Sequence, residues 1–214
     1  MIEIGKVLSG LAKQRPVFHS EADFQHAFAW EIHQGLPAAL IRLELPVQVK
    51  HQFFHIDIWV AYQDTVLAFE LKYKTRGLSV HVGGERYRLK DQSAQDIGRY
   101  DFVKDIQRLE QVATAYQSVI GYAILLTNDS AYWTTPANQN TVDAGFRLHD
   151  GRVLEGVLSW GANASEGTIK DREQPLELQG KYHLQWSGYS QPSPERYGEF
   201  RSLVVNVLPI KKAG

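Results

Sequence analysis

Three polar residues interrupt two segments of the chain that otherwise have the composition of β-strands. Residues 65–73 predict a strand, and because successive side chains alternate across a strand, Glu70 and Lys72 share one face. Asp57 holds a comparable position in the preceding strand-like segment, residues 53–62. A carboxylate or an ammonium group is costly to bury among apolar neighbours without a partner or a purpose. These three residues are therefore the first candidates for chemistry.

The link between the two segments, Gln63-Asp64, predicts a hairpin. A hairpin closed there puts Asp57 opposite a residue near Glu70, so that the two carboxylates become neighbours on one face. Neighbouring carboxylates repel each other and favour a divalent cation between them. Oxygen ligands in a chain without cysteine favour Mg²⁺ or Mn²⁺. Such an ion activates water and neutralises charge on a phosphate, and Lys72 would position that water or stabilise the transition state.

The order of Asp57 followed by Glu70-Leu71-Lys72 resembles the D…ExK signature of the PD-(D/E)xK nuclease superfamily. Residues 20–126 also follow the helix–strand–strand–strand–helix–strand order of that fold. The resemblance implies a restriction-endonuclease-like α/β fold with a mixed sheet flanked by helices, and Mg²⁺-dependent hydrolysis of phosphodiester bonds in nucleic acid, with DNA as the expected partner. Asp57, Glu70 and Lys72 would be catalytic, and the two acids would bind the metal. Ile56 stands where the signature has proline, a position at which the superfamily varies.

In this superfamily an acid on the preceding helix often completes the metal site. Ser20 is a typical N-cap residue, and Glu21 and Asp23 follow it in the first turn, where the helix dipole favours acids. Residues 20–34 therefore predict a helix. We assign Glu21 as the further metal ligand and catalytic acid, with Glu31 as the alternative because the helical phase does not decide between them.

Residues 91–117 predict the longest helix, with a break near Gly98. One face of this helix is polar, because its members recur at three- and four-residue spacing. They are Gln92, Gln95, Asp96 and Arg99. The resemblance implies that Gln95, or else Gln92, orients Lys72 or the water, and that Arg99 contacts a phosphate. Alternatively, this is a solvated face with internal pairs of Asp101 or Asp105 with Arg108.

Residues 74–90 predict a ribbon or flap with a local excess of positive charge. Its basic residues are Lys74, Arg76, Arg86, Arg88 and Lys90. The formal net charge of the whole chain is only −1, so this local excess favours contact with a nucleic-acid backbone, and Tyr87 could stack on a base. The alternative is an exposed hairpin that its charges keep soluble.

The chemistry has alternatives as well. Glu70 and Lys72 could form a structural salt bridge near a sheet edge, with Asp57 as an exposed strand acid. The fold could serve as a nucleic-acid-binding or protein-interaction module without catalysis, or the site could hydrolyse another phosphate ester. A homodimer is compatible with an enzyme that cuts both strands of a duplex.

The composition is that of an ordinary soluble domain. The chain has 214 residues, of which 43% are hydrophobic and 22% are charged. The absence of cysteine excludes disulfides, thiol catalysis and thiolate zinc sites. The N-terminus lacks the pattern of a signal peptide, and no apolar run approaches the roughly 18 residues of a membrane span. The expected location is the cytoplasm.

The second half of the chain predicts further strands. Residues 119–126 are almost continuously apolar, which indicates a strand covered on both faces. Asp150-Gly151 predicts a hairpin between residues 146–148 and 153–154. Segments 176–186 and 200–208 predict additional strands. We therefore expect a nuclease-like core over residues 1–127 and a β-rich C-terminal extension over residues 128–214, packed on the same domain.

Overall fold

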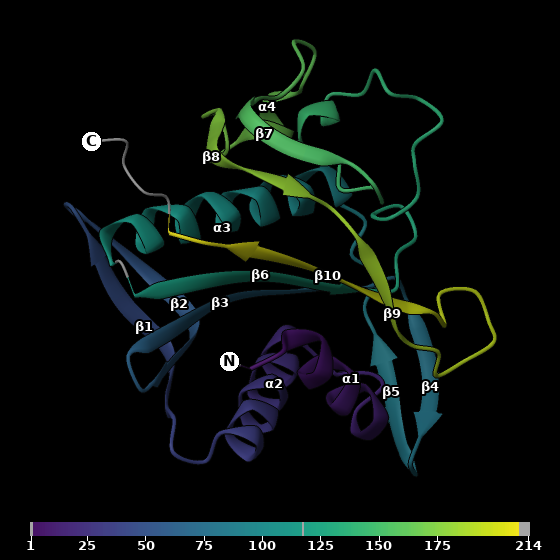
Figure 1. Cartoon of the computed structure of the whole chain (residues 1–214). Coiled ribbons are helices and arrows are strands. Elements are labelled where there is room, and N and C mark those ends of the chain that lie inside the picture. The colour runs from purple at the N-terminus through teal and green to yellow at the C-terminus, as the bar shows by residue number, and fades with distance from the viewer. Residues whose placement is uncertain (1, 117, 210–214) are drawn as a thin grey trace.

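A six-stranded sheet with helices on both faces forms the centre of the protein (Figure 1). The computed structural model describes residues 2–116 and 118–209. Its helices and strands are α1 (Ile4–Gln14), α2 (Glu21–Gly35), β1 (Leu40–Val49), β2 (Gln52–Tyr62), β3 (Thr65–Lys74), β4 (Leu78–Val82), β5 (Glu85–Leu89), α3 (Gln95–Ala115), β6 (Val119–Thr127), the 3₁₀ turn η1 (Ala144–Phe146), β7 (Val153–Leu158), α4 (Glu166–Ile169), β8 (Leu176–His183), β9 (Trp186–Ser190) and β10 (Phe200–Val207). The strand order in the sheet is β1-β2-β3-β6-β10-β9, with β3 and β6 parallel and the other neighbours antiparallel. The prediction of a mixed α/β fold is confirmed.

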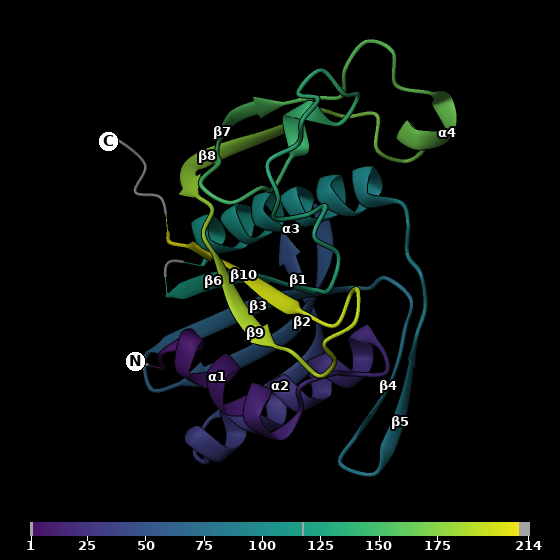
Figure 2. The same cartoon turned by 90° about the vertical axis from the view of Figure 1, so that its right-hand side faces the viewer.

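The sheet separates two hydrophobic layers. Helices α1 and α2 cover one face, and α3 covers the other (Figures 1 and 2). Strand β6 is buried on both faces, as its apolar run predicts. The small β7–β8 sheet and α4 lie on the outer side of α3. None of the helices in the described ranges combines the length and the hydrophobicity that a bilayer span requires.

Local signals in the sequence place the first two helices. In α1, the residues at helical spacing, Ile4, Val7, Leu8 and Leu11, form the buried face. The Ser20 side chain accepts a hydrogen bond from the Asp23 backbone N–H, so the predicted N-cap of α2 is confirmed. This cap fixes the first turn of α2, and with it the position of Glu21.

Helix α3 does not break at Gly98, contrary to the prediction. A Cβ atom at this position would lie 2.2 Å from the hydroxyl of Tyr132, a residue that is only 1% exposed. The glycine therefore admits a close neighbour and does not end the helix. The predicted end at Gln117 lies outside the described residues.

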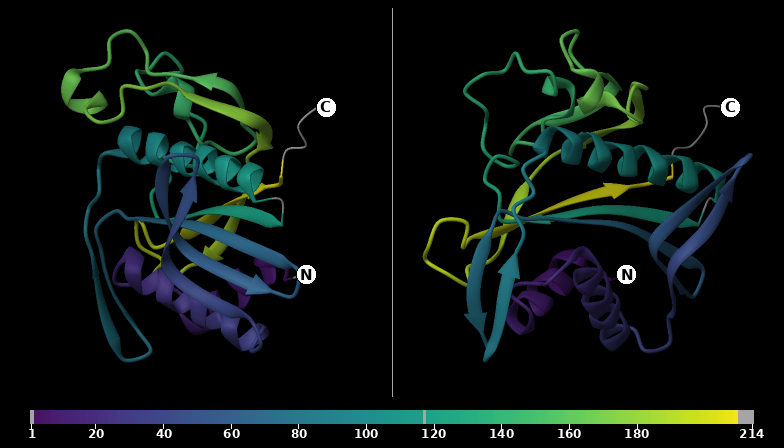
Figure 3. Two further views of the ribbon diagram at one scale, coloured as in Figure 1. Left: turned by 90° about the vertical axis from the view of Figure 1, so that its left-hand side faces the viewer. Right: turned by 180° about the vertical axis from the view of Figure 1, so that it is seen from behind.

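The β1–β2 ribbon bends where it passes the site, so that its two ends serve different layers. Ile58 of β2 belongs to the core under α1 and α2, whereas Ile56, two residues earlier, belongs to the core under α3. On β1, Glu44 has a positive φ of 51° and interrupts the regular pairing opposite Asp57. Beyond the bend the ribbon curves towards α3 (Figure 3). Asp57 therefore lies at the bend itself.

The C-terminal part differs from the predicted hairpin. Residues 144–146 form a 3₁₀ turn, and β7 pairs with β8 and not with the segment before Asp150. The predicted strand 176–186 divides into β8 and β9, while β10 pairs with β6 as well as β9. The C-terminal extension thus contributes two strands to the main sheet.

Candidate active site

Strands β2 and β3 separate at the position of Asp57. Their ladder ends at the pair Ile58–Phe69, so the next N–H groups on that side of β3 lack a strand partner from β2. The Asp57 carboxylate takes over this role, because its Oδ2 accepts a hydrogen bond from the Leu71 N–H at 2.6 Å. The divergence of the two strands therefore opens a wedge, and Asp57 occupies it.

Glu21 accepts a hydrogen bond from the same edge of β3, two residues beyond Leu71. Its Oε2 accepts a hydrogen bond from the Tyr73 N–H at 2.7 Å. Glu31, the alternative candidate, lies elsewhere, because its carboxylate accepts a bond from Gln14 of α1. Of the two candidate acids on α2, Glu21 is therefore the one that lies beside the edge of β3 to which Asp57 is bonded.

Glu70 and Lys72 point to the opposite layer from Leu71, towards α3. Arg108 Nη1 donates to Glu70 Oε1 at 2.8 Å, and Lys72 Nζ lies 2.8 Å from Asp105 Oδ2. The Glu70 side chain is 1% exposed and that of Lys72 is 18% exposed. The predicted shared face is therefore present, but the two residues pair with α3 and not with each other, so the suggested Glu70–Lys72 salt bridge is wrong.

These side chains form one group, which we call the Asp57 cluster. Its members are Glu21, Asp57, Glu70, Lys72, Asp105 and Arg108. The cluster contains four acidic and two basic side chains, so it has two acids more than it has bases.

Burial and mutual repulsion set the protonation of the cluster. Burial raises the pKa of Asp57 to about 6, although the Leu71 N–H and Lys72 act in the opposite direction. Burial, reinforced by the charges of Asp105 and Asp57, raises the pKa of Glu70, while Arg108 lowers it.

Lys72 is held in its charged form. Burial alone would lower its pKa, but Asp105, together with Glu21 and Asp57, raises the pKa above its ordinary value. A lysine that stays protonated at neutral pH cannot act as a general base. It can donate hydrogen bonds to water or to a phosphate oxygen.

The donor set of the cluster fits a hard divalent cation. Carboxylate oxygens are the ligands that Mg²⁺ and Mn²⁺ prefer. A cation would also offset the repulsion between neighbouring carboxylates that adds to the effect of burial on the pKa values of Asp57 and Glu70. In the present arrangement one oxygen of each of Asp57, Glu70 and Glu21 accepts a hydrogen bond. Over residues 2–116 and 118–209, no three His, Asp or Glu side chains are arranged to hold one metal ion as they now lie.

Comparison with models of known protein families gave no match, and comparison with curated protein sequences gave none either.

Sequence reasoning missed Gln25. Its buried Nε2 donates both to the Asp57 backbone oxygen at 2.7 Å and to Glu44 Oε1 at 2.8 Å. Gln25 therefore ties α2 to the bend that carries Asp57. A glutamine one position after Phe24, on the buried side of an amphipathic helix, was the available signal.

The part that Asp105 and Arg108 play was also missed. The sequence suggested a pair between them on a solvated face, and they do lie 3.7 Å apart. However, the Asp105 side chain is only 4% exposed, and both residues reach across to β3. An acid next to Ile106, within the apolar stripe of α3, is the feature that distinguishes this position from a solvated one.

Two assignments on the first turns of α3 need correction. Arg99 is 3% exposed and is paired with Asp143, so it is not available to a phosphate. Gln95 donates to Asp129 Oδ2 at 2.8 Å, whereas the partner of Lys72 on α3 is Asp105. The other candidate, Gln92, accepts a bond from the Thr75 N–H. The polar face of this end of α3 holds neighbouring loops in place.

The β4–β5 ribbon also differs from the expected flap. Tyr87 is 3% exposed and stacks on His19, so it packs against the α1–α2 connection and is not free to stack on a base. Arg86 and Arg88 lie on the other face of the ribbon and are exposed. Figure 2 shows the ribbon beside the layer of α1 and α2. Its outward face retains the expected positive charge.

Lys74 and Arg76 lie between the cluster and this ribbon. Lys74 is the last residue of β3 and is half-buried. Arg76 Nε lies 2.8 Å from Asp91 Oδ1, and its guanidinium carbon lies 5.1 Å from the centre of the Tyr197 ring. Arg76 is therefore part of a second arrangement, beyond the end of β3.

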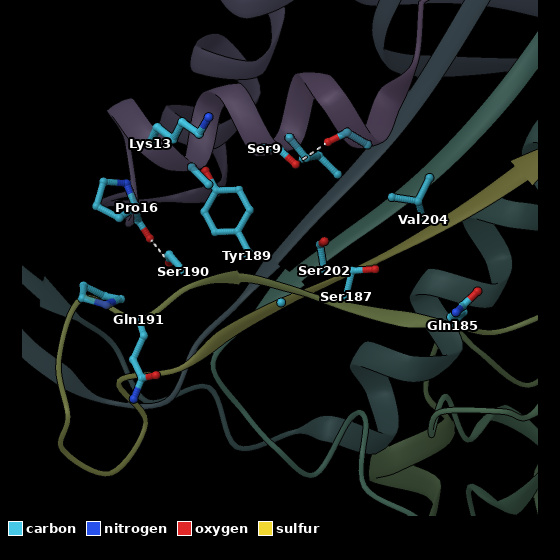
Figure 4. A pocket seen from close by; sticks show the side chains of 15 residues that line it. Ser9, Lys13, Pro16, Gln185, Ser187, Tyr189, Ser190, Gln191, Ser202 and Val204 are labelled. Atoms are coloured by element: carbon cyan, nitrogen blue, oxygen red, sulfur yellow. Dashed lines mark hydrogen bonds between the residues drawn. The ribbon is translucent and has the colours of Figure 1, made fainter.

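A cavity of about 640 Å³ lies on another side of the molecule, between α1 and the edge strand β9 (Figure 4). Lys13, Tyr189 and Ser202 are among its lining residues. The backbone oxygen of Pro16 accepts a hydrogen bond from Ser190, which joins the two walls. Among the described residues that line it, Lys13 is the charged one, so this cavity offers no set of acids and bases comparable with the Asp57 cluster.

Proposed function

We propose that this chain is a metal-dependent nuclease that hydrolyses phosphodiester bonds, with DNA as the expected substrate. The observation that carries the proposal is the meeting of Asp57, Glu70 and Lys72 at the wedge between β2 and β3. The order of α2, the antiparallel strands β1 to β3, α3 and the parallel strand β6 supports a restriction-endonuclease-like fold. A cytoplasmic enzyme, active as a monomer or a homodimer, is part of this proposal.

Asp57, Glu70 and Glu21 would hold Mg²⁺ or Mn²⁺. When bound, the ion supplies an activated water and neutralises charge on the phosphate. Lys72, kept protonated by Asp105, donates a hydrogen bond to that water or to a phosphate oxygen. Arg108 is a second cation at the same place, and one quarter of its side chain is exposed. It is therefore able to contact the phosphate as well as Glu70.

A second candidate function is nucleic-acid binding without cleavage. It is favoured by the two ion pairs, Glu70 with Arg108 and Lys72 with Asp105, because they balance buried charges within the protein itself. A module of this kind needs no metal.

The two functions are separated by a cleavage assay on linear, circular and single-stranded DNA and on RNA, in Mg²⁺, Mn²⁺ or EDTA. Wild type is compared with Glu70→Gln and Lys72→Met, and with the matched surface variants Glu155→Gln and Lys104→Met, whose positions are exposed. Thermal unfolding of each variant shows that it is folded.

A nuclease cleaves only with metal, and the two cluster variants lose at least about 100-fold in rate while the surface variants keep the wild-type rate. Cleavage in EDTA, or wild-type cleavage by Glu70→Gln, would contradict the proposal. A mobility shift that is the same with and without metal, with no cleavage, identifies the binding module. Turnover of a phosphodiester dye without action on polymers identifies a hydrolase of small phosphate esters.

A further inference from the structure

A second cavity, of about 500 Å³, lies beyond the carboxyl ends of the parallel strands β3 and β6. Residues of the loop between β9 and β10 line one side of it. Its chemistry comes from two arginines, two aromatic rings and a set of polar groups. The principal lining residues are Arg76, Asn128, Asp129, Trp133, Arg196 and Tyr197.

Tyr197 is the unusual residue of this cavity. Its φ angle is 65°, in the left-handed region that bulky residues rarely adopt. Two guanidinium groups lie over its ring, that of Arg76 at 5.1 Å and that of Arg196 at 4.6 Å from the ring centre. Backbone strain of this kind persists only where the surrounding structure holds the residue in that conformation.

The surroundings of Tyr197 do hold it in place. The Asn128 side chain is 1% exposed, and its Nδ2 donates to the Tyr197 backbone oxygen at 2.8 Å. The same amide accepts a bond from the Arg76 N–H at 2.7 Å. A Cβ atom at Gly198 would lie 2.0 Å from the Ser193 oxygen, so the loop closes tightly on itself. The aromatic ring and the arginine beside it are therefore presented by a rigid frame.

The charges of the cavity argue against a simple anion site. The lining includes Asp129, Glu195 and Glu199, which offset the two arginines. A ligand that binds through negative charge alone gains little here. The cavity offers flat groups instead, because the rings of Tyr197 and of the half-buried Trp133 are among its lining side chains. The Arg201 guanidinium lies over the Trp133 ring. Stacked rings and planar guanidinium groups favour a nucleobase.

We propose that this cavity binds an unpaired base of the nucleic-acid strand that reaches the Asp57 cluster. The inference rests on the proposed function. The chain continues past the end of β3 at Lys74, and the four residue steps from Lys72 to Arg76 span at most about 13 Å at strand geometry. That length corresponds to about four stacked nucleotides at 3.4 Å each. Lys74 lies between the two sites, so a strand bound at both would pass over it.

Fluorescence anisotropy with a labelled single-stranded DNA 12-mer in EDTA tests the proposal without any need for cleavage. The variants are Tyr197→Ala and Trp133→Ala, with Tyr197→Phe as the conservative partner. Trp30→Ala removes an aromatic side chain that is 61% exposed on α2, and so serves as the matched control. A second probe carries an abasic stretch in place of its bases.

We expect each alanine variant to weaken binding by about 5- to 100-fold, the range for the loss of one stacked base. Tyr197→Phe and Trp30→Ala should bind as wild type does, and the abasic probe should bind wild type as weakly as the intact probe binds Tyr197→Ala. Thermal unfolding identifies an alanine variant that is not folded. In that case the proposal is tested on the wild-type protein alone, by its binding of the abasic probe and by competition with mononucleotides.

Equal binding of the intact and abasic probes overturns the proposal, as does no binding of the 12-mer. Mononucleotides that compete as well as the oligomer overturn the assignment to a strand. If the oligomer binds as described while metal produces no cleavage, the proposed nuclease activity fails and this inference stands.

Discussion

Arg108 Nη1 lies 2.8 Å from Glu70 Oε1, which joins the middle of α3 to the central part of β3. Glu70 is almost completely buried, whereas Arg108 keeps a quarter of its side chain exposed. The two partners therefore depend on this contact unequally, because the carboxylate has little access to water if the arginine is removed.

Arg108→Met should lower the free energy of unfolding by about 3–5 kcal/mol, since it leaves a buried carboxylate without its partner. The double variant Glu70→Met/Arg108→Met should recover most of this loss, because it removes both charges. Urea unfolding of the two single variants and the double variant measures the coupling. Losses that simply add would show that the pair is not coupled.

The stability of the metal-free protein should depend on Asp57 between pH 4 and pH 6. The folded-state pKa of about 6 is above the ordinary value of 3.8, so the folded chain holds this proton more tightly, and a rise in pH through this window lowers stability. The full effect is about 3 kcal/mol. Urea unfolding in EDTA should therefore show that wild type loses about this much stability relative to Asp57→Asn between pH 4 and pH 7, because the asparagine has no proton to release. Exposed Asp64→Asn should show no such change.

If the cluster binds metal, Mg²⁺ or Mn²⁺ should stabilise the folded chain in the absence of nucleic acid. An ion at ten times its dissociation constant adds about 1.4 kcal/mol, which raises Tm by about 3–5 °C for a chain of this size. Differential scanning fluorimetry should show this shift in wild type and in Glu155→Gln. A shift of the same size in Glu70→Gln would place the ion elsewhere.

Gly98→Ala should destabilise the protein by about 1–3 kcal/mol, because the added methyl group meets the hydroxyl of buried Tyr132. Gly5→Ala is the matched substitution in α1, where nothing lies within 4 Å of the new atom, and it should be neutral or stabilising. Thermal unfolding compares the two. Tyr132→Phe in the Gly98→Ala background should restore part of the lost stability, because it removes the hydroxyl. If stability does not recover, the destabilisation by Gly98→Ala comes from the helix backbone and not from the contact with Tyr132.

The outward face of the β4–β5 ribbon should contribute to nucleic-acid affinity through charge alone. Arg86→Gln/Arg88→Gln should reduce binding of all DNA sequences alike and should lower the slope of log K against log salt by about 2. Salt titrations followed by anisotropy measure this slope. Lys170→Gln, on the exposed C-cap of α4, should leave it unchanged.

Short-range signals predicted the elements around the cluster well. The Ser20 cap, the Gln63-Asp64 link and the apolar run of β6 are each local features, and each marks an element that the structure contains. The hairpin register, whose last pair is Ile58–Phe69, puts Asp57 one residue beyond the ladder and next to the level of Glu70, because the turn position determines which residues face each other.

Contacts between distant segments were not predictable in the same way. Arg99 has the spacing of a surface residue, yet the loop that carries Asp143 folds over it and forms a buried ion pair. Tyr87 has the composition of an exposed ribbon residue, but His19 covers it. In both cases the partner lies far away in sequence, and no local pattern identifies it. The β7–β8 pairing was missed for the same reason.

The wedge between β2 and β3 has one more consequence. The Leu71 and Tyr73 amide protons are bonded to the carboxylates of Asp57 and Glu21, whereas most strand amides are bonded to carbonyl oxygens. Their NMR resonances should therefore move when the carboxylate that accepts the bond binds an ion. Two backbone amides in the middle of the molecule thus act as built-in spectroscopic reporters, one for each acid, that need no added label.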